Sequence, residues 1–364
     1  GDQRQRYDHQ DGAFRKRSQE PLYAQSGACG ENIQRSLPGA LIKQKQQKKE
    51  EKEENQEILI YNAGKEQKNF QQHIKKESGY EPDIIVKGDY NHAYVGALIA
   101  KKLFNTPTPY YLFIDNIIMG HHRGLYDDGE KRRILEREIP TDVSISNLDV
   151  NLNMPPCKSP QDIHHIIRML FSCLVDADRL DTERFMSPDK SQLRESKSSL
   201  DELLVKLETF LASLKTGADE TEVNKIRNEI QQYCIERSQA EIGYYSLTVP
   251  TGGGKTLSSV LWALKHAIKN NQKRIIIAIP YTSIIVQTAS VLRNIFGEEN
   301  VLEHHSMVNV SDEKHSETTL KQQLATENWD YPIIVTTNVQ LFESLFSNNP
   351  SDCRKLHNIA RSVI

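Results

Sequence analysis

Between residue 58 and about residue 186, the hydrophobic positions follow the period of an α-helix. Along residues 92–104 they recur every three or four positions, and the same spacing continues over several turns from Ile163 to Leu174. Stripes of this kind are typical of amphipathic helices with one buried face. Because the alternation typical of strands is scarce here, the sequence predicts an all-α region.

The pattern stays helical but becomes more polar through residues 190–240. A narrow stripe of leucines runs from Leu200 to Phe210, and Thr216-Gly217-Ala218 interrupts it. A polar helical stretch that ends at such a break predicts a connector between two domains.

From residue 244 onward, the hydrophobic runs become short and β-rich. These runs are Tyr245–Val249, Arg274–Ile279 and Pro332–Thr336, and helical segments at 256–269 and 283–296 separate them. Strands that alternate with helices of this length predict βαβ units and a parallel sheet. Val363-Ile364 has the composition of a further strand that begins there.

The first 57 residues have little periodicity, and residues 43–57 contain no apolar residue. Such a segment cannot bury enough surface to offset its ordering entropy. We therefore expect four regions: a poorly patterned segment 1–57, a helical domain 58–190, a helical connector 191–240 and a parallel α/β domain 241–364.

Composition narrows the picture only slightly. The 46 basic and 49 acidic residues leave a net charge of −3, so a nucleic-acid surface would have to be local. The five cysteines form no C-x-x-C pair, and no export signal or long apolar run is visible. These features predict a cytoplasmic protein with reduced thiols and no membrane partner.

A glycine-rich segment, TVPTGGGKT at residues 248–256, lies between a predicted strand and a predicted helix. In this context it predicts a phosphate-binding loop, in which backbone N–H groups and a helix N-terminus face the phosphates of ATP. Lys255 would reach the β- and γ-phosphates, and the Thr256 hydroxyl would hold Mg²⁺. Val249 replaces the first glycine of the general motif. Pro250-Thr251, directly before the glycines, resembles the superfamily 2 helicase variant of the loop. The candidate ATP-binding residues are Thr251, Gly252, Gly253, Gly254, Lys255 and Thr256.

Two further strand-to-helix turns follow in the order expected of such a helicase. Thr282 and Ser283 open one helix, and Thr337 and Gln340 lie at the start of another. Backbone amides and hydroxyls at these places suit the sugar-phosphate backbone of a single DNA strand. Each segment read alone is also compatible with an ordinary turn.

Histidines and an aspartate in the helical half suggest a metal site. His121 and His122 lie between glycines at a helix end, where both rings can turn inward, whereas His92 alone would be typical of a core histidine. Asp178 continues the buried stripe after Leu174, while Asp176 points to the other side. Imidazole and carboxylate ligands together suit Mn, Fe, Ni or Co.

The order of these motifs resembles the type I CRISPR-associated helicase-nuclease, most closely its type I-C branch, over roughly residues 58–364. The resembling segments are 64–73, 91–97, His121-His122, 173–178 and 246–256. The resemblance implies an HD-type nuclease domain before an ATP-driven, single-strand DNA translocase. It also implies metal ligands at His92, His121, His122 and Asp178, and recruitment to an RNA-guided CRISPR surveillance complex.

The chain departs from that family at the HD motif. Tyr61 and Asn62 stand at the two positions where the family has histidine and aspartate, and Lys65 follows as the candidate catalytic residue. We expect a degenerate nuclease centre that holds one metal rather than the two that clamp a phosphodiester. The family also continues beyond Val363-Ile364 into an Asp-Glu box and a second RecA-like lobe, so we expect this chain to be a fragment with an incomplete first lobe.

Two alternatives stay open at this point. The chain is either a helicase-nuclease or an inactive nucleotide-binding remnant or regulatory module. A third hypothesis is a different helicase with a structural helical domain, against which the histidine doublet and Asp178 argue.

Overall fold

The computed structural model describes residues 68–77, 91–103, 111–139, 157–194, 197–216, 219, 221–306 and 317–364. The predicted N-terminal segment 1–57, together with Tyr61, Asn62 and Lys65, lies outside the described residues. The described chain divides into two compact units, a sheet unit of residues 193–342 and 358–364 and a helical unit that ends at Gln192 and takes up residues 343–357 again. Within this described part, every helix is too short or too polar to cross a membrane.

The sheet unit is built on a four-stranded parallel sheet in the order β2-β3-β1-β4. Its strands are β1 Arg274–Ile279, β2 Val301–His304, β3 Ile333–Thr337 and β4 Ser362–Val363. Ile279 and Thr337 are paired at the carboxyl ends of the neighbouring strands β1 and β3. Turns that follow these two strands therefore emerge at the same edge of the sheet.

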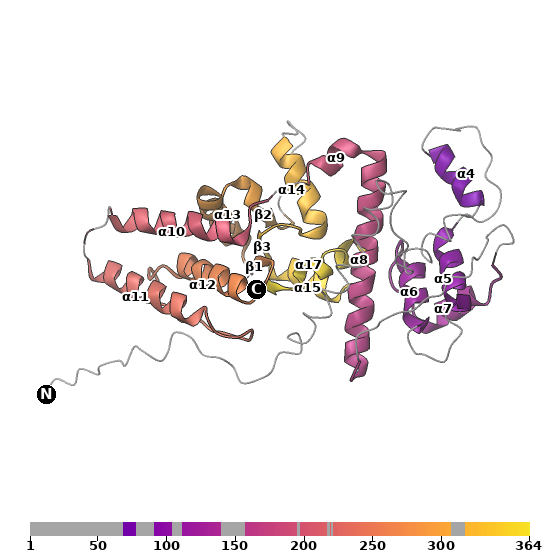
Figure 1. The fold of residues 1–364 in the computed structure, drawn as a ribbon, viewed down its shortest axis with the longest axis horizontal. Coiled ribbons are helices and arrows are strands. Elements are labelled where there is room, and N and C mark those ends of the chain that lie inside the picture. The colour runs from indigo at the N-terminus through magenta and orange to yellow at the C-terminus, as the bar shows by residue number, and fades with distance from the viewer. Residues whose placement is uncertain are drawn as a thin grey trace, which may run out of the picture. The chain divides into compact units, whose positions relative to one another are not determined.

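Helices around this sheet bury a single apolar core. They are α10 Leu200–Thr216, α11 Glu222–Arg237, α12 Lys255–Lys269, α13 Thr282–Phe296 and α14 Glu317–Asn328, with a 3₁₀ turn at Glu298–Asn300. Leu264, Ile285 and Val335 contribute fully buried side chains to the core cluster. Burying such a side chain stabilises a fold by roughly 1.5–3 kcal/mol. The packing of α10 and α11 against α12 is visible in Figure 1.

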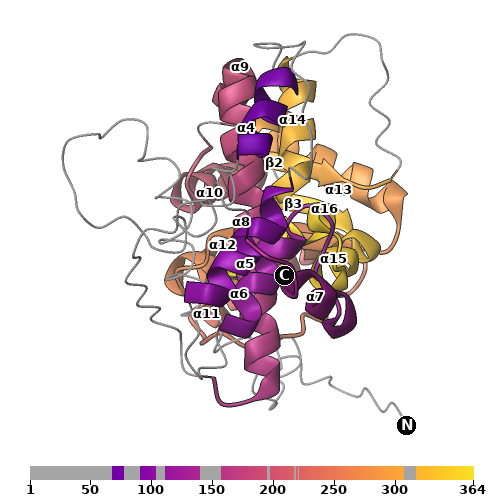
Figure 2. The same ribbon diagram turned by 90° about the vertical axis from the view of Figure 1, so that its right-hand side faces the viewer.

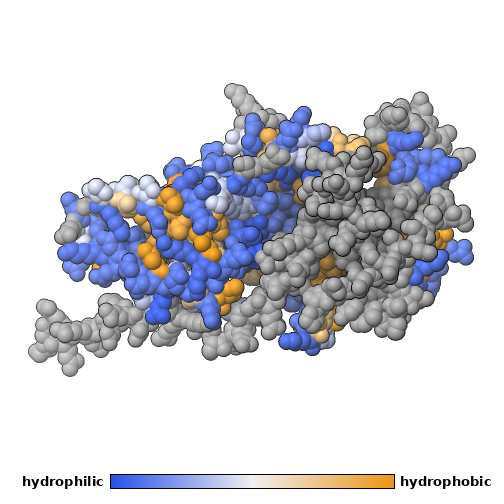
Figure 3. Space-filling model, in the orientation of Figure 1, coloured by the Kyte–Doolittle hydropathy of each residue, from blue (hydrophilic) through white to orange (hydrophobic). Residues whose placement is uncertain are grey.

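The surface of these helices is mainly hydrophilic. Figure 3 shows small apolar patches over the part of the sheet unit that carries α10 and α11. Val205 of α10 and Val223 of α11 are among the exposed apolar side chains. Isolated apolar side chains are normal on a protein surface. They are no sign of a docking face.

Most of the predicted α/β pattern is confirmed. The strand at 274–279 and the helices at 256–269 and 283–296 occur within one residue of their expected ends, and the sheet is parallel, as expected of a RecA-like domain. The prediction of a strand over Tyr245–Val249 is wrong, because only Leu247 forms a β-bridge there. A strand exists only where its backbone groups have ladder partners, which hydrophobic pattern alone does not reveal.

Every described element of the helical unit is a helix. The elements are α4 Lys68–Glu77, α5 His92–Leu103, α6 Tyr111–Gly120, α7 Asp128–Leu135, α8 Pro160–Met186, α9 Pro188–Gln192 and α16 Pro350–Cys353. Helix α15, Asn338–Phe346, enters this unit at Glu343, and α17, Leu356–Ile359, leaves it after His357. The expectation of an all-α region is confirmed for the described residues, whereas its HD-type class stays a prediction.

The long helix α8 organises this unit. Ser159 caps its N-terminus in a reciprocal capping box with Asp162, and Pro160 occupies its first position. Its middle packs Phe171 and Leu174 against Ile117 and Ile118 of α6. Helices α5 and α6 run side by side (Figures 1 and 2), which brings the start of α5 close to the end of α6.

Candidate nucleotide site and histidine site

The three glycines of the phosphate loop are required for two physical reasons. Gly252 and Gly254 have positive φ angles of 83° and 77°, in the left-handed region that disfavours side chains. A Cβ on Gly253 would lie 2.6 Å from Cγ1 of Val249, so no side chain fits there. The loop is therefore a backbone cradle of the kind that wraps phosphate groups.

Helix α12 begins directly after this cradle. Its N-cap residue is Gly254, which has no side chain to cap the first N–H groups. Such N–H groups and the positive end of the helix dipole favour an anion. Lys255 and Thr256 are exposed at the helix start. The residues present therefore fit the phosphates of ATP and its Mg²⁺.

Arg227 supports the loop from α11. Its Nε donates a 2.9 Å hydrogen bond to the carbonyl oxygen of Gly252, and its Nη1 donates to Oδ1 of Asn224 at 3.2 Å. The guanidinium thus holds the peptide of Gly252 in place, because a glycine has no side chain of its own to restrict its backbone. Arg227 could not be predicted from the sequence, because an arginine on a polar helix carries no motif of its own.

The candidate strand-binding residues follow β1 and β3 at one edge of the sheet. Thr282 and Ser283 open α13, where Tyr281 is the N-cap residue and provides no side-chain cap. Thr337 ends β3, and its Oγ1 accepts a 3.0 Å hydrogen bond from the backbone N–H of Gln340. The structure thus brings both predicted turns to neighbouring strand ends, although the Thr337 hydroxyl also serves as a helix cap.

Three histidines meet in the helical unit. Nε2 of His92 lies 3.2 Å from Nε2 of His121 and 3.3 Å from Nε2 of His122. All three residues place one ligand atom within 4.8 Å of the others. His92 begins α5 and His121-His122 follow α6, so the pairing of these two helices creates the cluster.

The geometry of this cluster suits a metal ion. Nδ1 of His121 donates a 2.5 Å hydrogen bond to the carbonyl oxygen of Ile118, which leaves the Nε2 lone pair directed at the cluster. Ligands at roughly 2.0–2.1 Å from a tetrahedral metal would be separated by about 3.3 Å. The two Nε2 separations from His92, 3.2 and 3.3 Å, agree with that value. The ring of Phe70 packs against His92 at a tilt, with the two ring centroids 4.3 Å apart.

The loop of the histidine doublet is held by the Asn116 side chain and by its own backbone. Oδ1 of Asn116 accepts a 3.0 Å hydrogen bond from the backbone N–H of Tyr126, and Nδ2 of Asn116 donates a 3.2 Å hydrogen bond to the carbonyl oxygen of Tyr126. The carbonyl oxygen of Gly120 accepts hydrogen bonds from the N–H groups of Arg123 and Gly124. The loop therefore closes tightly after α6 and limits where His121 and His122 can lie.

The two aspartates of α8 differ from expectation. Asp176, expected on the other side of the helix, is buried, and Asp178 is half-buried. The expectation that Asp178 continues the buried stripe is therefore only partly met, and the sequence did not predict the burial of Asp176. The physical reason is that residues 343–357 cover a second side of α8, which the local hydrophobic pattern cannot reveal. Within the described part of the chain, the group of side chains that could hold a metal consists of the three histidines. The ligand role of Asp178, like the roles of Tyr61, Asn62 and Lys65, stays a prediction.

The cradle, the helix start behind it and the parallel sheet together define a phosphate-loop domain of the RecA-like class. Residues 228–364 match the family model of the DEAD/DEAH box helicase, so this part of the chain is a superfamily 2 helicase domain. Helicases of this family act on nucleic acids and use ATP with Mg²⁺, as the motifs had predicted. No curated protein is matched by the chain.

Proposed function

We propose that this chain is part of a CRISPR-type helicase-nuclease, in which ATP-driven movement along single-stranded DNA is joined to metal-dependent DNA cleavage. The observation that carries the proposal is the convergence of His92, His121 and His122 in a helical unit of the same chain as the helicase domain. A helicase with a purely structural helical domain has no need for three imidazoles directed at one point.

In the sheet unit, the chain's own groups would bind and orient the nucleotide. The backbone N–H groups of the loop and Lys255 would hold the phosphates, and Thr256 would provide the Mg²⁺ ligand. When bound, Mg²⁺ neutralises developing charge on the phosphates. Arg227 would keep the Gly252 peptide in place.

In the helical unit, the three imidazoles would hold a divalent transition metal of the Mn, Fe, Co or Ni class. Such a metal, when bound, lowers the pKa of a water molecule and polarises a phosphate oxygen. Asp178 is the candidate for an additional, anionic ligand. Lys65 would assist at the same centre, in keeping with the resemblance.

The histidine group supports a second candidate, a module that binds nucleotide and DNA without cutting DNA. It brings together three neutral ligands and no carboxylate within the described part of the chain. A lone metal held by neutral ligands is a weak substitute for a bridged pair of metals. Under either candidate, we expect an RNA-guided surveillance complex on its DNA target as the partner. Retention of the chain by that loaded complex, but not by the unloaded complex, would test this.

The deciding experiment is a titration of the full chain with Co²⁺, followed by the visible absorption of the bound ion. We expect one Co²⁺ per chain and loss of the signal in His121→Ala. His164→Ala is the matched control, because His164 is exposed and lies outside the cluster. A parent chain that binds no Co²⁺, or a signal that His121→Ala leaves unchanged, would contradict the proposed metal centre.

A further inference from the structure

Residues 343–357 belong to two contexts. In sequence they lie within the helicase match at 228–364, directly after the strand-binding candidates Thr337 and Gln340. In the structure they form part of the helical unit that contains the histidines. We call them segment 343–357.

The first attachment of segment 343–357 is to Arg168 of α8. This buried guanidinium donates 2.7 Å hydrogen bonds to the carbonyl oxygens of Ser347 and Leu345. A planar guanidinium holds two acceptors in fixed relative positions. The start of the segment is therefore fixed on the helix.

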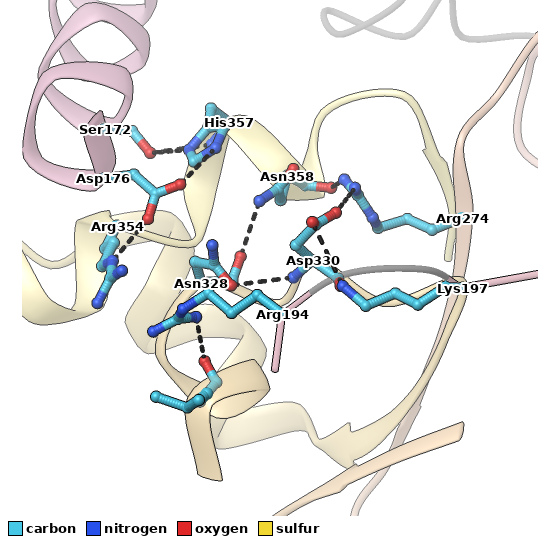
Figure 4. Close-up of polar contacts among 11 residues, drawn as sticks. Ser172, Asp176, Arg194, Lys197, Arg274, Asn328, Asp330, Arg354, His357 and Asn358 are labelled. Atoms are coloured by element: carbon cyan, nitrogen blue, oxygen red, sulfur yellow. Dashed lines mark hydrogen bonds and ion pairs between the residues drawn. The ribbon is translucent and has the colours of Figure 1, made fainter. Parts of the chain in front are cut away.

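The second attachment is a buried polar cluster around Asp176 of α8, drawn in Figure 4. Nε of Arg354 donates to Oδ1 of Asp176 at 2.6 Å, and Nε2 of His357 lies 3.3 Å from Oδ2. Ser172 lies 3.0 Å from Nδ1 of His357 and also accepts a hydrogen bond from the His357 backbone N–H.

Ser172 contacts His357, which contacts Asp176, and this succession of contacts is that of a hydrolase triad. We interpret the cluster instead as an anchor that holds segment 343–357 on α8. Ser172 has 0% exposure, so its hydroxyl is closed to any substrate. Removing one partner of such a buried pair leaves the other charge uncompensated, which is strongly destabilising.

The third attachment reaches the histidine loop itself. A Cβ on Gly124 would lie 2.6 Å from the carbonyl oxygen of Asn348, and the φ angle of Gly124 is +114°. Cys353 packs into the same core cluster as Ile117 and Ile118 at the end of α6. The segment thus touches the loop that follows His122 as well as the helix that carries Asp178.

We propose that segment 343–357 is the positioning element of the histidine site, and that it couples metal binding to single-strand binding by the preceding turn of the chain. Helix α15 begins at the strand-binding turn and runs into the segment. A change in that turn is therefore passed to the contacts with α8 and Gly124. The inference rests on the proposed metal centre.

The test uses Co²⁺ and an oligothymidylate with the full chain. Gly124→Ala should weaken Co²⁺ binding at least tenfold and alter the absorption bands of the bound ion, because the loop must move away from Asn348. Gly129→Ala is the matched control, since its added Cβ would approach only the Asp127 side chain, at 3.4 Å. If Gly124→Ala bound Co²⁺ with the affinity and absorption bands of the parent, the inference would be overturned, whereas the proposed metal centre would still hold. Absence of Co²⁺ binding in the parent would overturn both.

A measurement on the parent needs no folded variant. Saturating oligothymidylate should change the Co²⁺ dissociation constant at least threefold, and Co²⁺ should change oligonucleotide affinity by the same factor, as linkage requires. If Co²⁺ bound through the histidines with the same affinity in the presence and absence of the oligonucleotide, the proposed coupling would be overturned.

Discussion

Lys255 is the side chain on which nucleotide binding should depend most. It is exposed at the first position of α12, behind a loop whose other phosphate donors are backbone groups. Lys255→Ala should therefore weaken ATP binding at least tenfold, about 1.4 kcal/mol, as measured by calorimetry. Lys273→Ala, at an exposed lysine outside the loop, should bind like the parent. Equal affinity of Lys255→Ala and the parent would exclude this loop as the nucleotide site.

Arg227 should contribute to nucleotide binding through the loop rather than through the ligand. Arg227→Lys keeps the charge but loses the two-pronged contact with Gly252 and Asn224. A hydrogen bond of this kind contributes about 0.5–1.5 kcal/mol, so the ATP dissociation constant should rise roughly three- to tenfold. Arg237→Lys on the same helix serves as the control. If Arg227→Lys bound ATP as tightly as the parent, the prediction would be wrong, and the loop would keep its conformation without this arginine.

At this scale, the motif predicted which residues form the cradle but not what holds it. The glycines and Lys255 have a fixed spacing because phosphate geometry demands it. Arg227 and Asn116 act on backbone carbonyls and amides, which any suitably placed polar side chain can contact. Their roles therefore become visible only when distant parts of the chain are brought together.

At the scale of elements, we expect the stability of α8 to depend on an ionised Asp176. Burial raises the pKa of this carboxyl, but hydrogen bonds and charges from His357 and Arg354 outweigh burial and bring the pKa down to about 2, from an ordinary value of 3.8. A carboxylate with a lowered pKa in the folded state stabilises the fold above its unfolded pKa, and this contribution disappears as the pH falls towards 2.

Asp176→Asn should consequently lower the free energy of unfolding at pH 7 by about 2 kcal/mol or more. Urea unfolding at pH 7 and pH 3 would measure this, and the difference between parent and variant should shrink at the lower pH. Asp181→Asn, on the same helix, should have a much smaller effect. A difference that stayed constant between the two pH values would show that the charge of Asp176 is not what stabilises the fold.

Most elements could be predicted because their period is local. The stripes at 92–104 and 163–174 became α5 and α8, and the β-rich runs at 274–279 and 332–336 became paired strands. The failures share a cause. Residues 245–249 lack a ladder partner except at Leu247, and α8 is covered on a second side by a segment far away in sequence. Non-local partners decide such positions.

At the scale of the whole molecule, a net charge of −3 gives no general attraction to DNA. Binding should instead depend on the two turns after β1 and β3, which together offer few phosphate contacts. We therefore expect weak binding of a labelled oligothymidylate that falls steeply between 50 and 200 mM salt, as counterion release requires.

Ser283→Pro, which removes a backbone N–H at the start of α13, should weaken this binding several-fold in an anisotropy titration. Gln287→Ala, at an exposed position farther along α13, should not. Tight binding that is insensitive to salt would contradict backbone contacts at these turns.

The final prediction concerns DNA cleavage by the histidine site. Three neutral imidazoles bring no anionic ligand to the described group. Under the proposed resemblance, Tyr61 and Asn62 would stand where the family has a histidine and the carboxylate that bridges two metals. Without a bridging carboxylate, neither the attacking hydroxide nor the leaving oxygen is clamped. Cutting of a labelled single strand with Mn²⁺, Co²⁺ or Ni²⁺ should therefore be absent or very slow.

The double variant Tyr61→His with Asn62→Asp should bind more metal per chain than the parent, because it restores an imidazole and a carboxylate to the expected position. It should also cut the labelled strand faster than the parent in a side-by-side assay with each metal. Brisk cutting by the parent that His121→Ala abolishes would show that the centre is intact. An unchanged metal content in the double variant would place residues 61 and 62 away from the metal, since two new ligands beside a bound ion cannot leave its affinity unaltered.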